Sequence, residues 1–107
     1  MARPVRIQFP RALYHVIVRG NERNAVFRSD RDRSDYLERL AHYGEKFVYR
    51  LLAYCLMGNH VHLAIETGEA PLSRIMAGLQ SSYTQAFNRR HRRVGHLFQV
   101  RYVPGLT

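Results

Sequence analysis

The sequence is poor in features that mark several common classes of protein. Among its 107 residues there is one cysteine, Cys55, which excludes an internal disulfide framework and, in its apolar surroundings, predicts a buried and unreactive thiol. No run approaches the roughly 18 consecutive apolar residues of a membrane span, and the N-terminus carries no apolar signal-peptide core. Hydrophobic residues still make up 46% of the chain, enough for a folded core. We therefore expect residues 1–107 to form one soluble, cytoplasmic domain without a membrane partner.

Lysine and, in the last third of the chain, acidic residues are also scarce. The formal net charge of +9 comes from sixteen arginines and a single lysine, Lys46. Six of the arginines lie between Pro71 and Thr107, where there is no Asp or Glu, whereas residues 41–70 have two basic and three acidic residues. A guanidinium can bind phosphate through two hydrogen bonds and can stack on a base, so this pattern favours a nucleic-acid partner. A GC-rich coding sequence would raise the arginine content as well.

The order of apolar periodicities and turn residues predicts an α+β fold. Strands are expected at residues 12–19, 49–57, 60–66 and 96–103, the last stopped by Pro104-Gly105. Helices are expected at about residues 31–46 and 71–90, where apolar residues recur every three or four positions. The order strand, helix, strand, strand, helix, strand predicts the ferredoxin-like split β-α-β arrangement, an antiparallel sheet with two helices on one face.

The most informative short motif is a pair of histidines, His60 and His62, on the third predicted strand. Side chains two apart on a strand point to the same face, so the two imidazoles would lie together. The apolar residues of the strand would face the core from the other side: Val61, Leu63 and Ile65. Two adjacent imidazoles can bind one metal ion, although a His-x-His pair can equally be solvated or hydrogen-bonded. His15 lies on the first predicted strand, but the sequence does not fix its distance from the pair.

A single tyrosine, Tyr83, lies on the second predicted helix. It follows Leu79 by four residues and precedes Phe87 by four, which places it on the apolar face that packs on the sheet. A phenol directed at a bis-histidine metal site would suggest a covalent nucleophile. The alternative is that Tyr83 is an ordinary core residue of the helix.

Several motifs together resemble a known family. They are Met57-Gly58-Asn59-His60-Val61-His62-Leu63, Ser82-Tyr83-Thr84, Phe87-Asn88-Arg89-Arg90-His91, Gly95-His96-Leu97-Phe98-Gln99 and Arg101-Tyr102. This set strongly resembles the single-tyrosine insertion-sequence transposases of the HUH endonuclease superfamily, and within them the branch associated with repetitive extragenic palindromes. The resemblance extends from Tyr14 to Tyr102 and implies a ferredoxin-like fold.

The resemblance also implies a reaction. His60 and His62 would hold a divalent metal, Mg²⁺ or Mn²⁺, and Tyr83 would cut single-stranded or hairpin DNA to form a 5′-phosphotyrosine intermediate that another strand end can resolve. Family members commonly carry a polar third metal ligand one helical turn after the tyrosine. Phe87 occupies that position here, which leaves Asn88 as the nearest candidate and Gln80 as a weaker one.

Further expectations concern partners and completeness. Five arginines are predicted to contact DNA phosphates: Arg89, Arg90, Arg92, Arg93 and Arg101. The family relationship allows a homodimer. Relatives usually continue beyond the point reached at Thr107, which predicts a shortened C-terminus. The competing function is a non-catalytic nucleic-acid-binding module that keeps the fold and the basic surface.

Overall fold

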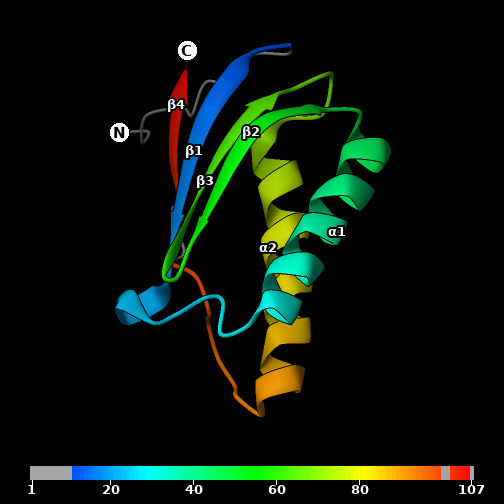
Figure 1. Cartoon of the computed structure of the whole chain (residues 1–107). Coiled ribbons are helices and arrows are strands. Elements are labelled where there is room, and N and C mark those ends of the chain that lie inside the picture. The colour runs from blue at the N-terminus through cyan, green and yellow to red at the C-terminus, as the bar shows by residue number, and fades with distance from the viewer. Residues whose placement is uncertain (1–10, 100–101, 107) are drawn as a thin grey trace, which may run out of the picture.

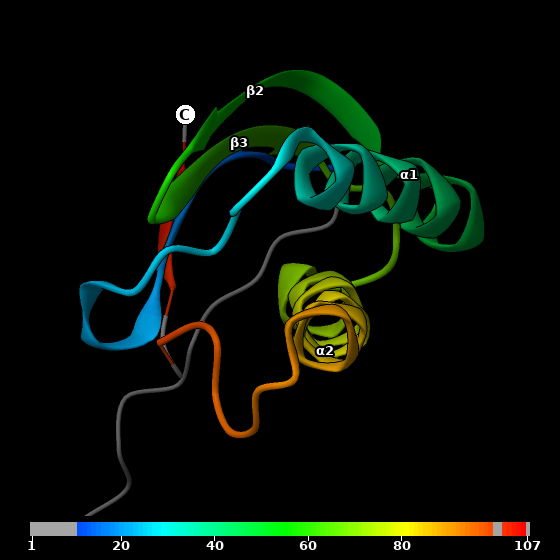
Figure 2. The ribbon, with the colours of Figure 1, turned by 60° about the horizontal axis from the view of Figure 1, so that its bottom comes forward.

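The computed structural model describes residues 11–99 and 102–106 (Figure 1). The described elements are β1 (Leu13–Arg19), a short 3-10 turn η1 (Asn21–Arg23), α1 (Asp30–Phe47), β2 (Arg50–Met57), β3 (His60–Glu66), α2 (Leu72–His91) and β4 (Val103–Leu106). The four strands form one sheet in the order β2-β3-β1-β4, and every neighbouring pair is antiparallel. Both helices cover the same face of this sheet (Figures 1 and 2). The predicted α+β, ferredoxin-like fold is thereby confirmed.

Local sequence signals account for the ends of these elements. Gly58 and Asn59 form the tight turn of the β2-β3 hairpin, in which Met57 pairs directly with His60. Ser29 caps α1 by accepting a hydrogen bond from the Asp32 N–H at 3.3 Å. α2 begins after Pro71, which has no N–H that would need a partner at the start of a helix. It ends before Arg92, whose backbone adopts the left-handed conformation.

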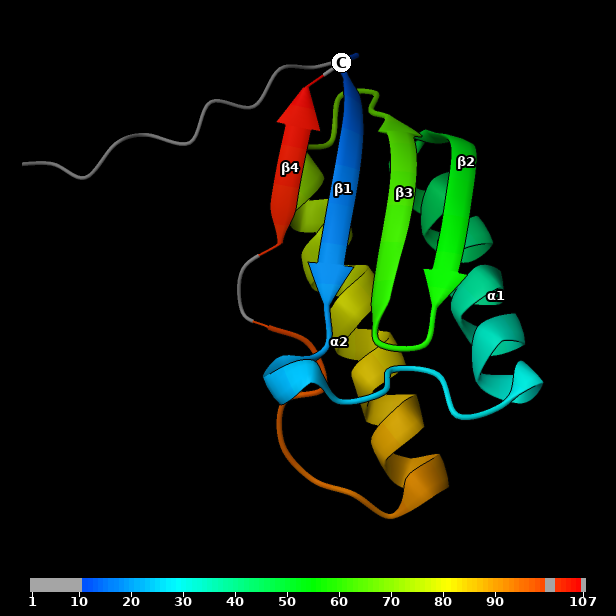
Figure 3. The ribbon, with the colours of Figure 1, turned by 60° about the vertical axis from the view of Figure 1, so that its left-hand side comes forward.

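One core fills the space between the sheet and the two helices. Its strand residues alternate with outward-facing ones along β1 and β3, and its helix residues follow the apolar stripes of α1 and α2. The fully buried members include Val16, Val61, Leu63, Ile65, Tyr36, Leu40, Ile75, Leu79, Tyr83 and Phe87. The opposite face of the sheet, seen in Figure 3, is covered by no described helix.

The prediction for the last strand was wrong in its position. Residues 96–99 contribute only an isolated bridge between Phe98 and Gly20, and Leu97 and Phe98 are instead buried in the core, while residues 100–101 of the predicted strand lie outside the described residues. The strand proper, β4, runs through Pro104 and Gly105, which were expected to stop it. Among the described residues β4 pairs with β1 alone and is an edge strand, where proline is tolerated because the outer side needs no hydrogen-bond donors.

The expected burial of Cys55 was also wrong. β2 is the other edge strand, and Cys55 pairs with His62 on the face that the helices leave open, so its thiol is exposed. Within the described residues, no helix is both long and apolar enough to cross a membrane.

Candidate functional site

The histidine pair lies where the alternation of β3 places it. Val61 and Leu63 are completely buried on the helix side, and His60 and His62 therefore project from the open face of the sheet. Their ring centroids are 5.0 Å apart. The two imidazoles are thus close neighbours on an uncovered surface.

A third histidine joins this pair from β1. His15 lies on the same face because the antiparallel register pairs Ile17 with His62 and His15 with Ala64. The His15 Nε2 lies 3.1 Å from the His62 Nδ1, and the two rings are stacked with centroids 5.3 Å apart. The sheet register therefore builds a three-histidine cluster from residues far apart in the sequence.

The hydrogen bonds of this cluster select which ring nitrogens can bind a metal. His60 Nδ1 is 2.8 Å from the Asn59 side-chain oxygen, which can only accept, so His60 donates from Nδ1 and keeps a lone pair on Nε2. The hydrogen bond between His62 Nδ1 and His15 Nε2 has no such fixed direction, and in the tautomer in which His62 donates, the lone pair of His62 lies on Nε2. Partial burial, and then the nearby charges of His60, His15 and Arg19, lower the pKa of His62. The neutral imidazole that results is the form that binds metal.

A cavity of about 450 Å³ opens beside the histidines. Its lining comes from the end of β1, from η1, from the hairpin turn, from the start of β3 and from the segment after α2: Arg19, Gly20, Arg23, Asn59, His60, His62 and Gln99. Arg19 stands directly opposite His60 in the β1-β3 ladder. No carboxylate lines the cavity, so its described walls are neutral or positively charged.

The donor set fits a metal site with few protein ligands. In the part of the chain that the structure describes, no group of three or more His, Cys, Asp or Glu side chains is arranged to hold a metal ion. His60 and His62 are suited to supply two nitrogen ligands, and water or a phosphate oxygen would complete the coordination. An ion held in this way would remain open to substrate.

Tyr83 lies elsewhere, which corrects the expectation that its phenol points at the histidine pair. It is completely buried in the helix-side core, where its hydroxyl donates a hydrogen bond of 2.6 Å to the Val26 carbonyl. Its ring packs edge-on against Tyr36 and beside Phe87. Burial, reinforced by the Asp32 carboxylate, raises the pKa of Tyr83 well above its ordinary value. The physical reason is that the apolar stripe of α2 packs on the same sheet face as Val61 and Leu63, and the histidines necessarily face away from it.

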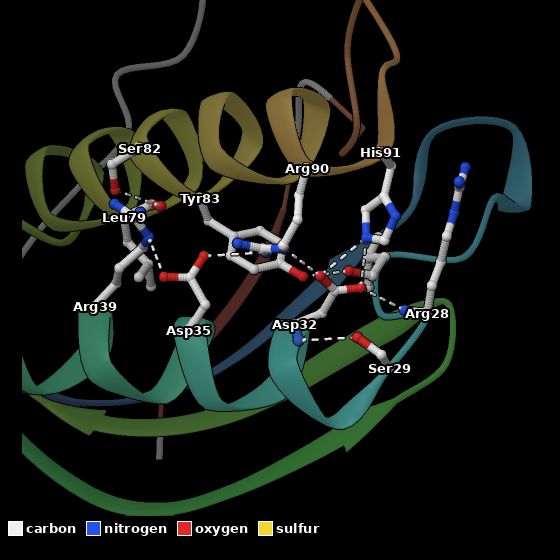
Figure 4. Close-up of polar contacts among 11 residues, drawn as sticks. Arg28, Ser29, Asp32, Asp35, Arg39, Leu79, Ser82, Tyr83, Arg90 and His91 are labelled. Atoms are coloured by element: carbon white, nitrogen blue, oxygen red, sulfur yellow. Dashed lines mark hydrogen bonds and ion pairs between the residues drawn. The ribbon is translucent and has the colours of Figure 1, made fainter.

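The end of α2 nearest Tyr83 is joined to the start of α1 by a buried ionic network (Figure 4). The completely buried Asp32 accepts hydrogen bonds from the Arg28 backbone N–H and the Arg90 Nε, each at 2.8 Å, and lies 2.9 Å from the His91 Nε2. Burial alone would raise the pKa of Asp32, but the hydrogen bonds from Arg28, His91 and Arg90 outweigh it, and the pKa is lowered. Arg90 also contacts Asp35 at 3.2 Å.

Two further candidate residues have partners within the fold. Arg90, predicted to contact DNA, pairs with Asp32 and Asp35 and has 21% of its side chain exposed, so its contact with DNA stays a prediction. Asn88, the candidate third ligand, donates to the Gly95 carbonyl at 2.9 Å and accepts from Arg93 at 2.7 Å, so its amide closes the loop after α2 instead of meeting the histidines.

The remaining predicted residues divide into three groups. Gln80 is partly buried on α2 and accepts a hydrogen bond from the buried Tyr36 hydroxyl, on the helix side of the sheet. Arg93 also donates to the His96 carbonyl, whereas Arg89 and Arg92 are exposed at the end of α2 and keep their predicted role in DNA contact. Arg101 lies outside the described residues.

Comparison with known proteins identifies the family. The sequence profile described as "Transposase IS200 like" matches residues 8–105, which is nearly the whole chain. The protein therefore belongs to the IS200-like transposase family, as its motifs predicted. A search of curated proteins gave no match.

Two solved structures share the fold. The REP-associated tyrosine transposase bound to a REP hairpin superposes with a TM-score of 0.79 at 13% identity, over 100% of this chain and 62% of the other. A protein of Deinococcus radiodurans R1 assigned as a transposase gives a TM-score of 0.69 at 16% identity, over 97% of this chain and 82% of the other. The chain thus spans less than two thirds of the REP-associated transposase.

Sequence reasoning missed Arg19, Arg23 and Gln99 as neighbours of the histidines. Strand alternation could have placed Arg19 on the same face as His15. Its position opposite His60 depends on the β1-β3 register, and the approach of Gln99 depends on the path of the chain after α2. Neither is encoded in a local pattern.

Proposed function

We propose that this transposase acts in metal-assisted cleavage and rejoining of single-stranded or hairpin DNA. The observation that carries the proposal is the cluster of His15, His60 and His62 on the open face of the sheet, beside a cavity lined by arginine. Membership of the family supports DNA as the substrate. The similar fold of a REP-associated transposase bound to a REP hairpin supports hairpin DNA as the first substrate to test.

The histidines would supply the metal-binding part of the mechanism. A divalent ion bound there, Mg²⁺ or Mn²⁺, would polarise a phosphoryl oxygen and offset the negative charge of the transition state. His60 and His62 would bind it through Nε2, while Asn59 and His15 hold the two rings in orientation through Nδ1. Both ligands are neutral, so they would leave the full charge of the ion available to the phosphate.

A phosphotyrosine intermediate requires a phenol at this cavity. All seven tyrosines of the chain lie among the described residues, and none of them lines the cavity. Tyr83 could attack a phosphate held there only after leaving the core, and its raised pKa opposes the loss of its proton. We therefore propose that the histidine cavity binds metal and phosphate, and that Tyr83 in its observed position is not the attacking group.

A gel assay for a covalent adduct tests both parts of this proposal. The purified chain would be incubated with labelled single-stranded hairpin DNA and Mn²⁺ and run under denaturing conditions, beside Tyr83→Phe, His62→Ala and the control His42→Ala. His42 is exposed on α1, away from the histidine face, so this control removes an imidazole without touching the cluster. We expect any cleavage or adduct to be lost in His62→Ala and kept in His42→Ala.

The presence or absence of the adduct in the Tyr83→Phe variant then shows whether Tyr83 is the nucleophile. An adduct that persists in this variant supports a group other than Tyr83, whereas an adduct lost in a folded Tyr83→Phe protein would require the tyrosine to leave the core. Metal-dependent cleavage that survives in His62→Ala would overturn the proposed metal site.

The burial of Tyr83 favours one alternative function, a non-catalytic module that binds nucleic acid. Such a module would keep salt-sensitive binding to single strands and would give no cleavage with any of the hairpins tested. The homodimer that the family relationship allows stays a prediction.

A further inference from the structure

Arginine side chains reach the histidine cavity from two elements outside the His-x-His motif. Arg19 is the last residue of β1, and Arg23 is the last residue of the η1 turn that follows. Both line the same cavity as His60 and His62. Their positive charge is unopposed within the cavity, because its described lining includes no Asp or Glu.

The backbone holds the η1 turn firmly against the hairpin and the segment after α2. Gly20 N–H donates to the Asn59 carbonyl and Asn21 N–H donates to the Leu97 carbonyl, both at 2.8 Å. On the other side of the turn, Gln99 N–H donates to the Arg19 carbonyl, also at 2.8 Å. These bonds fix the backbone from which both arginines project before any ligand arrives.

Two backbone features show that the conformation of the η1 turn is tightly constrained. A Cβ on Gly20 would lie 2.1 Å from the Asn24 carbonyl oxygen, so only glycine permits this path of the chain. Glu22 and Arg23 both adopt positive φ values, 54° and 61°, which residues with a side chain rarely do. The conformation that brings Arg23 to the cavity is therefore imposed by the surrounding contacts.

We propose that Arg19 and Arg23 form a subsite that binds a backbone phosphate of a single-stranded nucleic acid, independently of metal. Guanidinium groups match phosphate through two parallel hydrogen bonds, and the side-chain amides of Asn59 and Gln99 line the same cavity as further donors. The described lining includes no Phe or Tyr side chain, and its aromatic rings are the imidazoles of the two candidate metal ligands, which favours contact with the backbone over the bases. This inference rests on the proposed function, since it places the phosphate beside the candidate metal ligands.

Binding of DNA without metal tests the subsite. The probe is a fluorescein-labelled oligothymidylate, measured by fluorescence anisotropy in EDTA with the unmodified chain, Arg19→Gln and Arg23→Gln. The matched control is Arg31→Gln, which removes the same charge from an exposed position near the start of α1. We expect roughly tenfold weaker binding for each cavity variant, and binding within about twofold of the unmodified chain for the control.

The salt dependence separates a lost phosphate contact from a general loss of structure. Removing both arginines should reduce the slope of log affinity against log salt concentration by about 0.7, the value for one phosphate contact on a single strand, and each single variant should account for part of that reduction. Circular dichroism melting checks that the variants are folded. Should Arg19→Gln or Arg23→Gln fail to fold, the corresponding lysine variant keeps the charge and the side-chain stem, and we expect it to bind more weakly because it loses the two-point contact.

The outcomes distinguish the subsite from the proposed function. Cavity variants that bind the oligonucleotide as tightly as Arg31→Gln would overturn the subsite, even if Mn²⁺ binds the histidines and cleavage is observed. Loss of affinity in the cavity variants supports the subsite, even if electron paramagnetic resonance detects no Mn²⁺ binding and the metal-dependent function fails.

Discussion

The Tyr83 hydroxyl donates its hydrogen bond to the carbonyl oxygen of Val26, at 2.6 Å, inside the core between the sheet and the helices. This bond joins the middle of α2 to the loop that leads from η1 to α1. It satisfies a buried carbonyl group and a buried phenol at the same time. The only tyrosine of α2 therefore has a structural role in the observed arrangement.

Replacing Tyr83 by phenylalanine should therefore reduce stability. The variant keeps the ring but leaves the Val26 carbonyl without its donor, and we expect the free energy of unfolding to fall by about 1 to 2 kcal/mol. Urea unfolding followed by circular dichroism measures the change. Tyr54→Phe is the matched control, because Tyr54 is 52% exposed on the edge strand and should give no measurable loss. Equal stability of the two variants would contradict a structural role for the Tyr83 hydroxyl.

The buried carboxylate of Asp32 should make stability depend on pH in the acid range. Its folded-state pKa is lowered from the ordinary value of 3.8, so the unfolded chain binds the proton more readily than the folded one. The stabilisation from ionised Asp32 is thus fully present above about pH 5 and is lost as the pH falls through its lowered pKa. We expect Asp32→Asn to reduce the free energy of unfolding by about 3 kcal/mol at neutral pH, because Arg90 and His91 lose their charged partner.

Urea unfolding of both proteins at a series of pH values measures this effect. The difference in stability between the unmodified chain and Asp32→Asn should shrink as the pH is lowered below the ordinary value of 3.8. Asp30→Asn is the control, since Asp30 is fully exposed at the start of α1. A difference that stays constant down to the lowest pH would show that ionisation of Asp32 is not its source.

The sequence patterns were sufficient for the fold class, for both helices and the first three strands, and for the direction of the histidines. Alternation along β3 placed His60 and His62 on one face and Val61 on the other. Together with the apolar stripe of α2, it also predicts the face of the sheet on which Tyr83 packs. The apolar stripe of α2 must pack on the apolar face of β3, so a residue on that stripe cannot face the histidines as long as both patterns hold. The expectation that the Tyr83 phenol is directed at the histidines was wrong because it took the sheet as the target without asking which face of the sheet each pattern occupies.

Other parts of the site depended on long-range pairing. The contact between His15 and His62 follows from the β1-β3 register, and the partners of Arg90 follow from the packing of α2 on α1. β4 begins only at Val103, after a segment in which Leu97 and Phe98 turn into the core. Local periodicity carries no information on such contacts, because they are decided by which elements become neighbours in the folded chain.

The contact between His15 and His62 predicts an effect on metal binding. Without His15 the ring of His62 loses the partner at Nδ1 that holds its orientation, and the affinity for Mn²⁺ should fall by roughly tenfold in His15→Ala. Titration with Mn²⁺, followed by the electron paramagnetic resonance signal of the unbound ion, measures the affinity without DNA. His42→Ala is again the matched control and should bind as the unmodified chain does. Unchanged affinity in His15→Ala would mean that His62 is oriented without this contact.

Two adjacent arginines at the end of α2, Arg89 and Arg90, should have separable effects. Arg89 is exposed, whereas Arg90 pairs with the buried Asp32 and with Asp35. We expect Arg90→Gln to lower the melting temperature and to leave the salt dependence of single-strand binding unchanged, because its charge is engaged within the fold. Arg89→Gln should leave the melting temperature unchanged and reduce the salt slope by about 0.7 if Arg89 contacts one phosphate. Circular dichroism melting and anisotropy with labelled oligothymidylate measure both properties on the same samples. A reduced salt slope in Arg90→Gln would show that this arginine leaves its ion pairs to contact DNA, and the network between the helices would then open on binding.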